Sequence, residues 1–216
     1  MKKLTLLFIF ISSLGYSQNS DLGNWLIYIG SKKIDSKWNI HNEVQYRNYN
    51  AIGDLEQLLL RTGVGYNLSP NNNNILLGYG FIRSENYDDL DEKSANNEHR
   101  IYQQFTTKQS FGRVKWQHRY RLEERFVSSG FKLRFRYFLA AKVALNKPKL
   151  EKNTIYLSAY NEVFINNKNT FFDRNRMYGG LGYVLNKNVK LELGYMNQLF
   201  NVGSRDQINI FGVVNF

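Results

Sequence analysis

Polar and apolar residues alternate along most of this chain, in segments separated by short runs of Asn, Asp, Ser, Gly and Pro. The segment 115–126 is the clearest, because Trp116 and Tyr120 share one face while Arg119 and Arg121 lie on the other. A repeat of two residues is the period of a β-strand, which turns one face to a dry environment and the other to water. The pattern therefore predicts an all-β protein.

Eleven segments of this kind follow one another, and the last ends on the aromatic residue Phe216. We expect strands at residues 22–33, 37–49, 56–68, 74–86, 98–111, 113–127, 131–146, 153–165, 174–185, 188–200 and 205–216. Soluble β-sandwiches rarely need strands this long, whereas about 9–11 residues let a tilted strand cross a bilayer. We therefore predict a single-domain, antiparallel transmembrane β-barrel whose apolar face contacts lipid and whose polar face lines the lumen.

The number of strands does not follow from the pattern alone. Single-chain bacterial barrels have an even number of strands, so we expect 10–12, with one segment split or merged or with residues 18–24 threading the lumen. Turn-like links and longer links also alternate along the chain, and this alternation would place the longer set at the cell surface. The short links are residues 35–36, 69–73, 112, 146–149 and 186–188, and the longer ones include 85–97 and 166–173.

The first residues indicate export. Lys2 and Lys3 precede a nearly continuous apolar stretch at 4–11, and small residues follow up to Ser17. This is the layout of a secretory signal peptide, with cleavage expected after Ser17. The apolar stretch is much shorter than the roughly 20 residues of a spanning helix. We therefore expect residues 1–17 to be a signal peptide and 18–216 to be one barrel in the bacterial outer membrane.

Composition narrows the choice of partners. The chain has no cysteine, which excludes disulfides and thiolate metal sites. Aromatic residues make up 15% of it, which suits the interfacial girdles of a membrane barrel. The net charge is +11, but Lys and Arg follow the strand alternation instead of forming the patch typical of nucleic-acid proteins. We expect outer-membrane lipid and lipopolysaccharide as partners, no nucleic acid, and a monomer.

Several strand motifs resemble one known family. They include the stretches 97–104 (NEHRIYQQ), 118–126 (HRYRLEERF), 134–137 (RFRY), 160–164 (YNEVF) and 194–198 (GYMNQ). Together they resemble the uncharacterised bacterial family catalogued as domain of unknown function 2490, from about Gly23 to Phe216. The resemblance implies an outer-membrane barrel and implies no activity.

The polar strand faces carry a series of arginines and glutamates that we expect to form a luminal charge network. Its members are Glu43, Arg47, Arg61, Glu98, Arg100, Arg119, Arg121, Glu123, Arg125, Arg134, Arg136, Glu162, Arg176 and Glu192. Neighbouring strands bring such side chains to about 5 Å between Cβ atoms. The network either fills a narrow barrel with paired charges or forms a small anion-preferring pore or binding cleft, because arginines outnumber glutamates. We predict that loss of Arg121 leaves a luminal carboxylate unpaired and lowers stability.

Two other classes of protein remain as alternatives. A barrel enzyme that modifies outer-membrane lipids needs a nucleophile beside a base, but His41, His99 and His118 have no serine two residues away. A soluble, lipocalin-like periplasmic barrel would turn Trp38 and Ile40 inward. We expect no catalytic residue.

No cofactor or metal site is expected either. The loop acids Glu85, Asp88, Asp89, Asp91 and Glu92 lack the spacing of a calcium loop. We expect them to be solvated surface charges. No nucleotide-binding loop, zinc spacing or redox pair occurs in the sequence.

Overall fold

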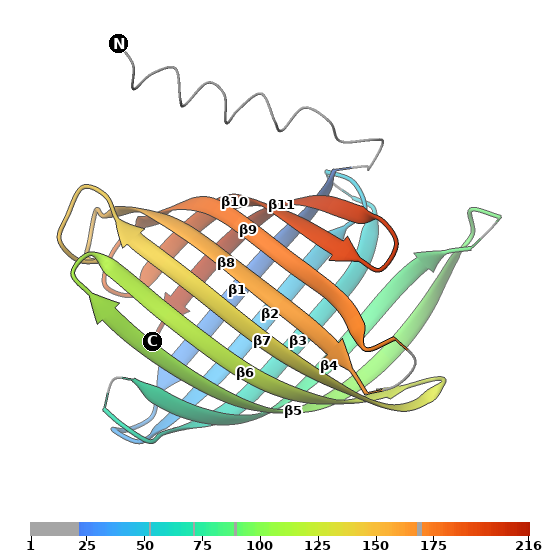
Figure 1. Ribbon diagram of the computed structural model, residues 1–216, viewed down its shortest axis with the longest axis horizontal. Coiled ribbons are helices and arrows are strands. Elements are labelled where there is room, and N and C mark those ends of the chain that lie inside the picture. The colour runs from blue at the N-terminus through green and yellow to red at the C-terminus, as the bar shows by residue number, and fades with distance from the viewer. Residues whose placement is uncertain (1–21, 52, 71, 89, 168–169) are drawn as a thin grey trace, which may run out of the picture.

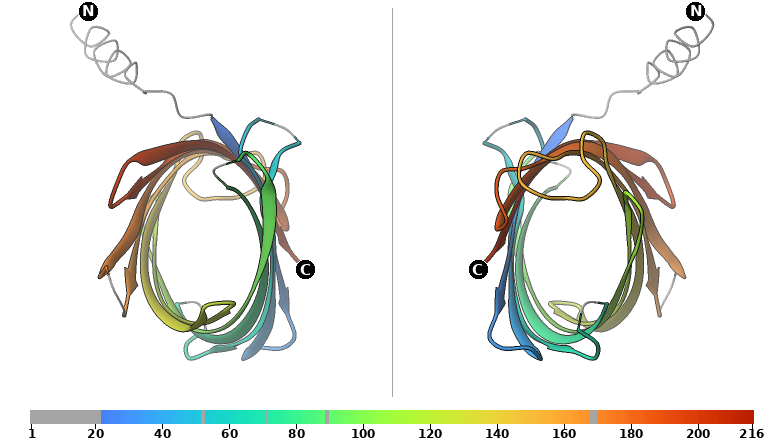
Figure 2. Two further views of the ribbon diagram at one scale, coloured as in Figure 1. Left: turned by 90° about the vertical axis from the view of Figure 1, so that its right-hand side faces the viewer. Right: turned by 90° about the vertical axis from the view of Figure 1, so that its left-hand side faces the viewer.

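The computed structural model describes residues 22–51, 53–70, 72–88, 90–167 and 170–216 (Figure 1). In this part of the chain eleven strands form a closed barrel in the order β1-β11-β10-β9-β8-β7-β6-β5-β4-β3-β2. Their bounds are β1 (Gly23–Lys33), β2 (Trp38–Asn48), β3 (Leu55–Asn67), β4 (Asn73–Tyr87), β5 (Lys93–Phe111), β6 (Val114–Val127), β7 (Gly130–Ala144), β8 (Ile155–Asn166), β9 (Phe172–Val184), β10 (Val189–Phe200) and β11 (Ser204–Asn215). Seen end-on, the barrel is oval (Figure 2).

The predicted all-β barrel is confirmed, and its strand number lies within the expected range. The observed bounds agree with the predicted ones to within two residues, except that β5 begins at Lys93, five residues before its expected start. The predicted signal peptide, residues 1–17, lies outside the described residues. Among the residues that are described, no helix has the length and apolarity needed to cross a membrane.

The barrel closes on a parallel pair of strands. β1 runs alongside β11 from Gly23 beside Gln207 to Ser31 beside Asn215. Consecutive hairpins reverse direction at each turn, so the first and last of an odd number of strands point the same way and must pair in parallel. The general rule that single-chain bacterial barrels have an even number of strands therefore does not hold for this chain, whose eleven predicted segments are eleven strands. Gly23 and Asn215 consequently lie at opposite openings, which we call the N-terminal mouth and the C-terminal mouth.

The predicted alternation of short and long connections is also wrong in two places. The link between β7 and β8 was expected to be short, but residues 145–154 are the longest connection among the described residues. The expected long link at 85–97 is mostly strand, because β4 continues to Tyr87 and β5 resumes at Lys93. These two strands project beyond the barrel rim as a hairpin at the N-terminal mouth (Figure 1). Loop length therefore does not assign the two mouths to sides of a membrane.

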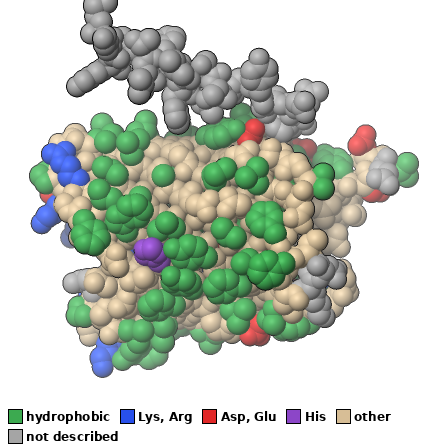
Figure 3. All heavy atoms as spheres, in the orientation of Figure 1, with side chains coloured by type: hydrophobic (Ala, Val, Ile, Leu, Met, Phe, Trp, Pro, Cys, Tyr) green, Lys and Arg blue, Asp and Glu red, His purple; other side chains and the backbone are tan. Residues whose placement is uncertain are grey.

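The outward face of the barrel is largely apolar. On β10, Leu191, Leu193 and Tyr195 are 47%, 57% and 41% exposed, whereas Glu192 between them is 6% exposed. The same alternation recurs on the other strands, so large hydrophobic side chains cover the visible wall (Figure 3). The inward positions are the ones that build the site.

Candidate functional site

Strand alternation places the predicted charge network in the lumen. Twelve of its fourteen members are buried: Glu43, Arg47, Arg61, Glu98, Arg100, Arg121, Glu123, Arg134, Arg136, Glu162, Arg176 and Glu192. The other two, Arg119 and Arg125, have side chains that are 19% and 18% exposed. Ion pairs join the members around Glu98, Glu123 and Glu162 into one network, whereas Glu43 pairs with Arg61 and Glu192 lies apart.

Glu123 is the centre of this network. Its carboxylate is fully buried and accepts hydrogen bonds from Arg134 Nη2 at 2.7 Å and Arg136 Nη1 at 2.6 Å. Two further guanidinium groups lie close to it, those of Arg121 at 3.6 Å and Arg100 at 3.7 Å. A buried carboxylate is stable only when it is paired and hydrogen-bonded, and here four arginines supply that pairing.

Arg121 has a different role from the one predicted. Its Nε and Nη2 donate to Gln104 Oε1 at 3.0 and 2.6 Å, and its guanidinium lies 4.4 Å above the ring of Tyr102. Because Arg134 and Arg136 hold Glu123 without it, loss of Arg121 would not leave that carboxylate unpaired. The prediction that Arg121→Ala strands a carboxylate is therefore wrong, because sequence spacing does not reveal how many partners Glu123 has.

A second carboxylate extends the network around the barrel. Glu162 on β8 accepts hydrogen bonds from Arg136 Nη2 at 2.6 Å and from Arg119 Nη2 at 2.7 Å. Arg136 therefore bridges Glu162 and Glu123 with its two Nη groups, a geometry that the planar guanidinium fork allows.

Two smaller clusters complete the network. Glu98 accepts from Arg100 Nη2 at 2.9 Å and from Arg125 Nε at 2.6 Å. Glu43 on β2 accepts from Arg61 Nη1 on β3 at 3.0 Å. Glu98 and Arg100 lie two residues apart on β5, whereas the Glu98–Arg125 and Glu43–Arg61 pairs join hydrogen-bonded neighbouring strands and follow from cross-strand register.

The lumen also contains an apolar layer that the sequence analysis did not identify. Tyr160 stacks on Tyr178 with ring centroids 4.7 Å apart, and the layer continues to Phe138 at 5.0 Å and Phe211 at 5.5 Å. Tyr160 and Tyr178 share the inward parity of Glu162 and Arg176 on their own strands. That parity could have indicated that the two tyrosines face the lumen, but the expectation of a wholly polar lumen led us to overlook it.

Buried side chains from strands on all sides fill much of the lumen. Those with at most 2% of their surface exposed include Leu59, Ile82, Tyr102, Arg121, Tyr156, Phe164, Met196, Gln198, Gln207 and Asn209. A barrel of about eight strands has room only for side chains, whereas 16 or more leave a channel. In this eleven-strand barrel, large buried side chains fill much of the interior.

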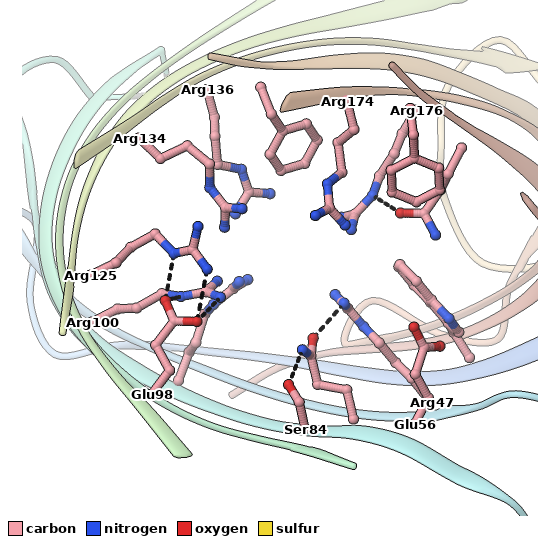
Figure 4. A pocket seen from close by; sticks show the side chains of 16 residues that line it. Arg47, Glu56, Ser84, Glu98, Arg100, Arg125, Arg134, Arg136, Arg174 and Arg176 are labelled. Carbon is pink, nitrogen blue, oxygen red and sulfur yellow. Dashed lines mark hydrogen bonds and ion pairs between the residues drawn. The ribbon is translucent and has the colours of Figure 1, made fainter. Parts of the chain in front are cut away.

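Next to the charge network, toward the N-terminal mouth, is a cavity of about 140 Å³ (Figure 4). Two register irregularities lie at its wall, one between Arg47 and Asn48 and one between Phe164 and Ile165. Such irregularities bend a strand and re-aim its side chains. Eight arginines but only two carboxylates line the cavity: Arg47, Arg61, Arg100, Arg125, Arg134, Arg136, Arg174, Arg176, Glu56 and Glu98.

The opposite half of the lumen has a different chemistry. Glu192 lies there, apart from the other network members, and accepts from Lys142 Nζ at 2.6 Å and from the Tyr156 hydroxyl at 3.1 Å. Basic side chains are visible at this end of the molecule (Figure 3). Most lysines of the described chain lie in strand ends or links at the C-terminal mouth, namely Lys32, Lys33, Lys37, Lys108, Lys115, Lys142, Lys147, Lys149, Lys152, Lys187 and Lys190.

The histidines have tyrosine and carboxylate partners. His99 Nδ1 lies 2.6 Å from the Tyr79 hydroxyl, and His118 Nδ1 lies 2.9 Å from the Tyr137 hydroxyl. His41 faces Glu43 at 3.5 Å. No serine is hydrogen-bonded to a histidine among the described residues, so no observation favours the lipid-modifying alternative.

The acidic loop offers no metal site in the described part of the chain. There, no group of three or more His, Cys, Asp or Glu is placed to hold an ion. Asp89 lies outside the described residues. Asp88 instead accepts hydrogen bonds from the backbone N–H groups of Leu90 and Glu92, both at 2.9 Å, which is a local turn.

Comparison with known proteins gives a family and no activity. The sequence profile of the proteins of unknown function DUF2490 matches residues 22–209. An uncharacterized protein of Methylorubrum extorquens is 30% identical over 163 residues, which cover 72% of this chain and 69% of that protein. No solved structure matches the chain.

Proposed function

We propose that this chain, which belongs to the DUF2490 family of proteins of unknown function, is a β-barrel of the bacterial outer membrane whose lumen is closed. The observation that carries the proposal is the contrast between the two faces of its strands. The outward face is apolar and exposed, whereas the inward face holds paired charges around the fully buried Glu123. An apolar outer wall around a polar interior is the arrangement that a barrel needs in lipid.

The height of the apolar wall supports a membrane location. On β6 the outward-facing Trp116 and Phe126 are 37% and 44% exposed, and they lie toward the C-terminal and N-terminal mouths respectively. Ten residues at about 3.3 Å each and a tilt of about 40° give a height of about 25 Å, the thickness of the apolar band in such barrels. Further aromatic pairs lie at both ends, Trp38 with Tyr66 and Phe126 with Phe131, like interfacial girdles.

Export by a signal peptide at residues 1–17 is part of the same proposal. It rests on the basic, apolar and small-residue regions of the first 17 residues. The surrounding partners would then be outer-membrane lipid and lipopolysaccharide.

The filled interior supports a closed barrel over an open pore. Tyr102 is fully buried and Arg121, which lies against its ring, is 2% exposed. Both come from the middle of their strands, where an open channel would leave them in contact with water. In this proposal the middle of the lumen is closed, and the arginine-lined cavity lies between it and the N-terminal mouth.

A narrow anion-preferring pore is the second candidate. The excess of arginines over carboxylates around the cavity favours it, since arginine-lined pores attract anions. The two candidates share the same fold and differ only in whether ions pass the middle of the lumen.

Conductance in a planar lipid bilayer separates them. The protein without residues 1–17 would be refolded in detergent, inserted, and measured under a salt gradient, with insertion checked by flotation of the same protein in vesicles. We expect insertion without steady current. A double variant, Tyr102→Ala with Arg121→Ala, serves as the matched control, because it removes two neighbouring side chains from the closed middle and should produce current.

The two possible contrary outcomes test the closed lumen and the membrane location separately. Steady anion-selective current from the unmodified protein would replace the closed barrel with the pore. A protein that stays soluble without detergent and does not float with vesicles would overturn the membrane location, in favour of a soluble barrel.

A further inference from the structure

Two buried arginines of the lumen have no carboxylate partner in the described part of the chain. The other buried arginines each lie within 4.0 Å of at least one Glu or Asp oxygen. Arg47 and Arg176 are 6% and 7% exposed and make no such ion pair with a described residue. Both line the cavity at the N-terminal mouth.

These two guanidinium groups share one aromatic ring. The guanidinium carbon of Arg47 on β2 lies 3.7 Å from the ring centroid of Trp25, and that of Arg176 on β9 lies 4.8 Å from it. Trp25 belongs to β1 and is 2% exposed. Figure 4 shows the Arg47 and Arg176 side chains entering the cavity from different sides. Stacking on an aromatic face holds each cation in place but does not neutralise it.

Their hydrogen bonds are to neutral amides. Arg47 donates through Nε to Gln45 at 2.9 Å and through Nη1 to Gln57 at 2.7 Å. Arg176 donates through Nε to Gln198 at 2.7 Å. Within the described residues its Nη groups have no hydrogen-bond acceptor, so they remain available to a ligand. The amides orient the two forks while leaving their positive charges uncompensated.

The carboxylate at this wall of the cavity is paired through one of its two oxygens, while its Oε2 is buried without a hydrogen-bond partner among the described residues. Glu56 lines the cavity, but its Oε1 pairs with Arg205 Nη1 at 2.8 Å. Two like charges in one enclosed site destabilise it unless a counter-ion is present. The cavity of about 140 Å³ exceeds by roughly tenfold the 10–15 Å³ that one water needs, so an oxyanion fits.

We propose that Arg47 and Arg176 form a binding site for a phosphate group, which enters the cavity from the N-terminal mouth. The planar fork of arginine matches the spacing of phosphate oxygens and favours a doubly charged oxyanion over chloride. Arg174 lines the same cavity and supplies a third guanidinium. The group comes either from free phosphate or from the phosphorylated headgroup of a lipid, and these sources share one chemistry.

Binding to the full-length mature chain in detergent tests this site directly. Inorganic phosphate is titrated by calorimetry in one arm, and a short-chain phosphatidic acid in the other, both at 0.1 M NaCl to screen weak surface attraction. We expect binding with one site per chain and a loss of about tenfold or more in affinity for Arg47→Gln and for Arg176→Gln. Arg113→Gln is the matched control, because it makes the same charge change at the exposed β5–β6 turn of the C-terminal mouth and should leave affinity unchanged.

A measurement without variants covers the case in which a substitution prevents folding. Phosphate should raise the thermal midpoint of the unmodified protein relative to chloride at equal ionic strength, because a ligand stabilises the folded state it binds. Charge-conserving Arg176→Lys should lose part of that rise, since lysine lacks the fork.

The outcomes distinguish the two sources of the phosphate group, and they also decide whether the site exists. Phosphate binding that depends on Arg47 and Arg176 supports a free phosphate source, and lipid binding alone with that dependence supports a headgroup. Absence of binding in both arms, or equal affinity in the two variants and the unmodified chain, would overturn the site. The binding assay is carried out in detergent solution, so absence of phosphate binding would not contradict the membrane location. Conversely, a protein that does not insert into a bilayer could still bind phosphate.

Discussion

The Glu123 carboxylate accepts a 2.6 Å hydrogen bond from Arg136, which is not its direct neighbour across the sheet. The residue opposite Glu123 on β7 is Arg134, and Arg136 lies diagonally, opposite Arg121. Diagonal positions are about 7–8 Å apart at Cα, within reach of a long side chain. Arg136 uses this reach to join Glu123 to Glu162 on the far side of β7, so one guanidinium connects three strands.

Loss of the Glu123 charge is expected to destabilise the barrel strongly. Glu123→Gln removes the carboxylate that four arginines share, and breaking a buried pair costs about 3–5 kcal/mol because buried charge is left uncompensated. The measurement is the free energy of unfolding by urea in detergent. Glu151→Gln, at a side chain that is 59% exposed, makes the same chemical change and should have little effect. Equal midpoints for the two variants would contradict a central role for Glu123.

The parallel seam can be tested by a disulfide. Leu26 on β1 and Ile210 on β11 are register partners and both point outward, at 44% and 41% exposure. Neighbouring strands are about 4.8 Å apart, which suits the Cα separation of a disulfide. The chain has no cysteine of its own, so Leu26→Cys with Ile210→Cys should cross-link on oxidation.

The control for this cross-link places the two cysteines on strands that are not neighbours. Leu193 on β10 is the partner of Ile210 on its other side, which puts it about 10 Å from Leu26. Leu26→Cys with Leu193→Cys should therefore remain reduced under the same conditions. Cross-linking of this pair, or none between positions 26 and 210, would argue against the eleven-strand closure.

A glycine in the lumen makes room for a tyrosine. The Tyr102 ring lies over Gly78 of the neighbouring strand, so closely that a Cβ at Gly78 would clash with Cζ of the ring. Tyr102 is fully buried and has Arg121 against its face, so the ring has little space to move. We expect Gly78→Ala to cost about 1–3 kcal/mol in unfolding free energy, as overpacking does.

The matched control for this change is Gly179→Ala. A Cβ at Gly179 would meet no atom within 4 Å, so the same substitution should be nearly neutral there. Urea unfolding in detergent measures both. If Gly78→Ala is as stable as Gly179→Ala, the close contact with Tyr102 does not limit the packing of the lumen.

The odd strand number predicts where the ends of the barrel lie in a membrane. Because β1 and β11 are parallel, an epitope ahead of Leu22 and one after Phe216 should be exposed on opposite sides of the outer membrane. Antibody labelling of intact cells, compared with permeabilised cells, checks this. An even-numbered barrel would put both epitopes on the same side, and that result would contradict the topology.

Strand positions could be predicted because their cause is local. The alternation in segment 115–126 reflects the contact of each side chain with one of two environments, and β6 spans Val114–Val127 accordingly. The same parity placed Glu123, Arg134 and Glu162 on the inward face, where they are buried. The sequence pattern did not predict how far β4 and β5 extend in their hairpin, because the polar residues there lack the alternation that marked the other strands.

The partners of each luminal charge could not be predicted, because they depend on register and on closure. Register decides that Arg134 is opposite Glu123 and that Arg136 reaches it diagonally. Sequence order also cannot show which charges remain unpaired, since that requires every neighbour of a side chain to be known. The four contacts of Glu123 and the missing carboxylate at Arg176 are properties of the assembled lumen.

The sequence by itself determined the strands, their two faces and the residues available to the lumen, because a period of two is set by the backbone of each strand. Only the tertiary structure decided that eleven strands close through a parallel pair, which no local pattern encodes. That closure places β1 between β2 and β11, and Arg47 and Arg176 therefore meet at Trp25. Their juxtaposition is a consequence of the ring and would not exist in an open sheet.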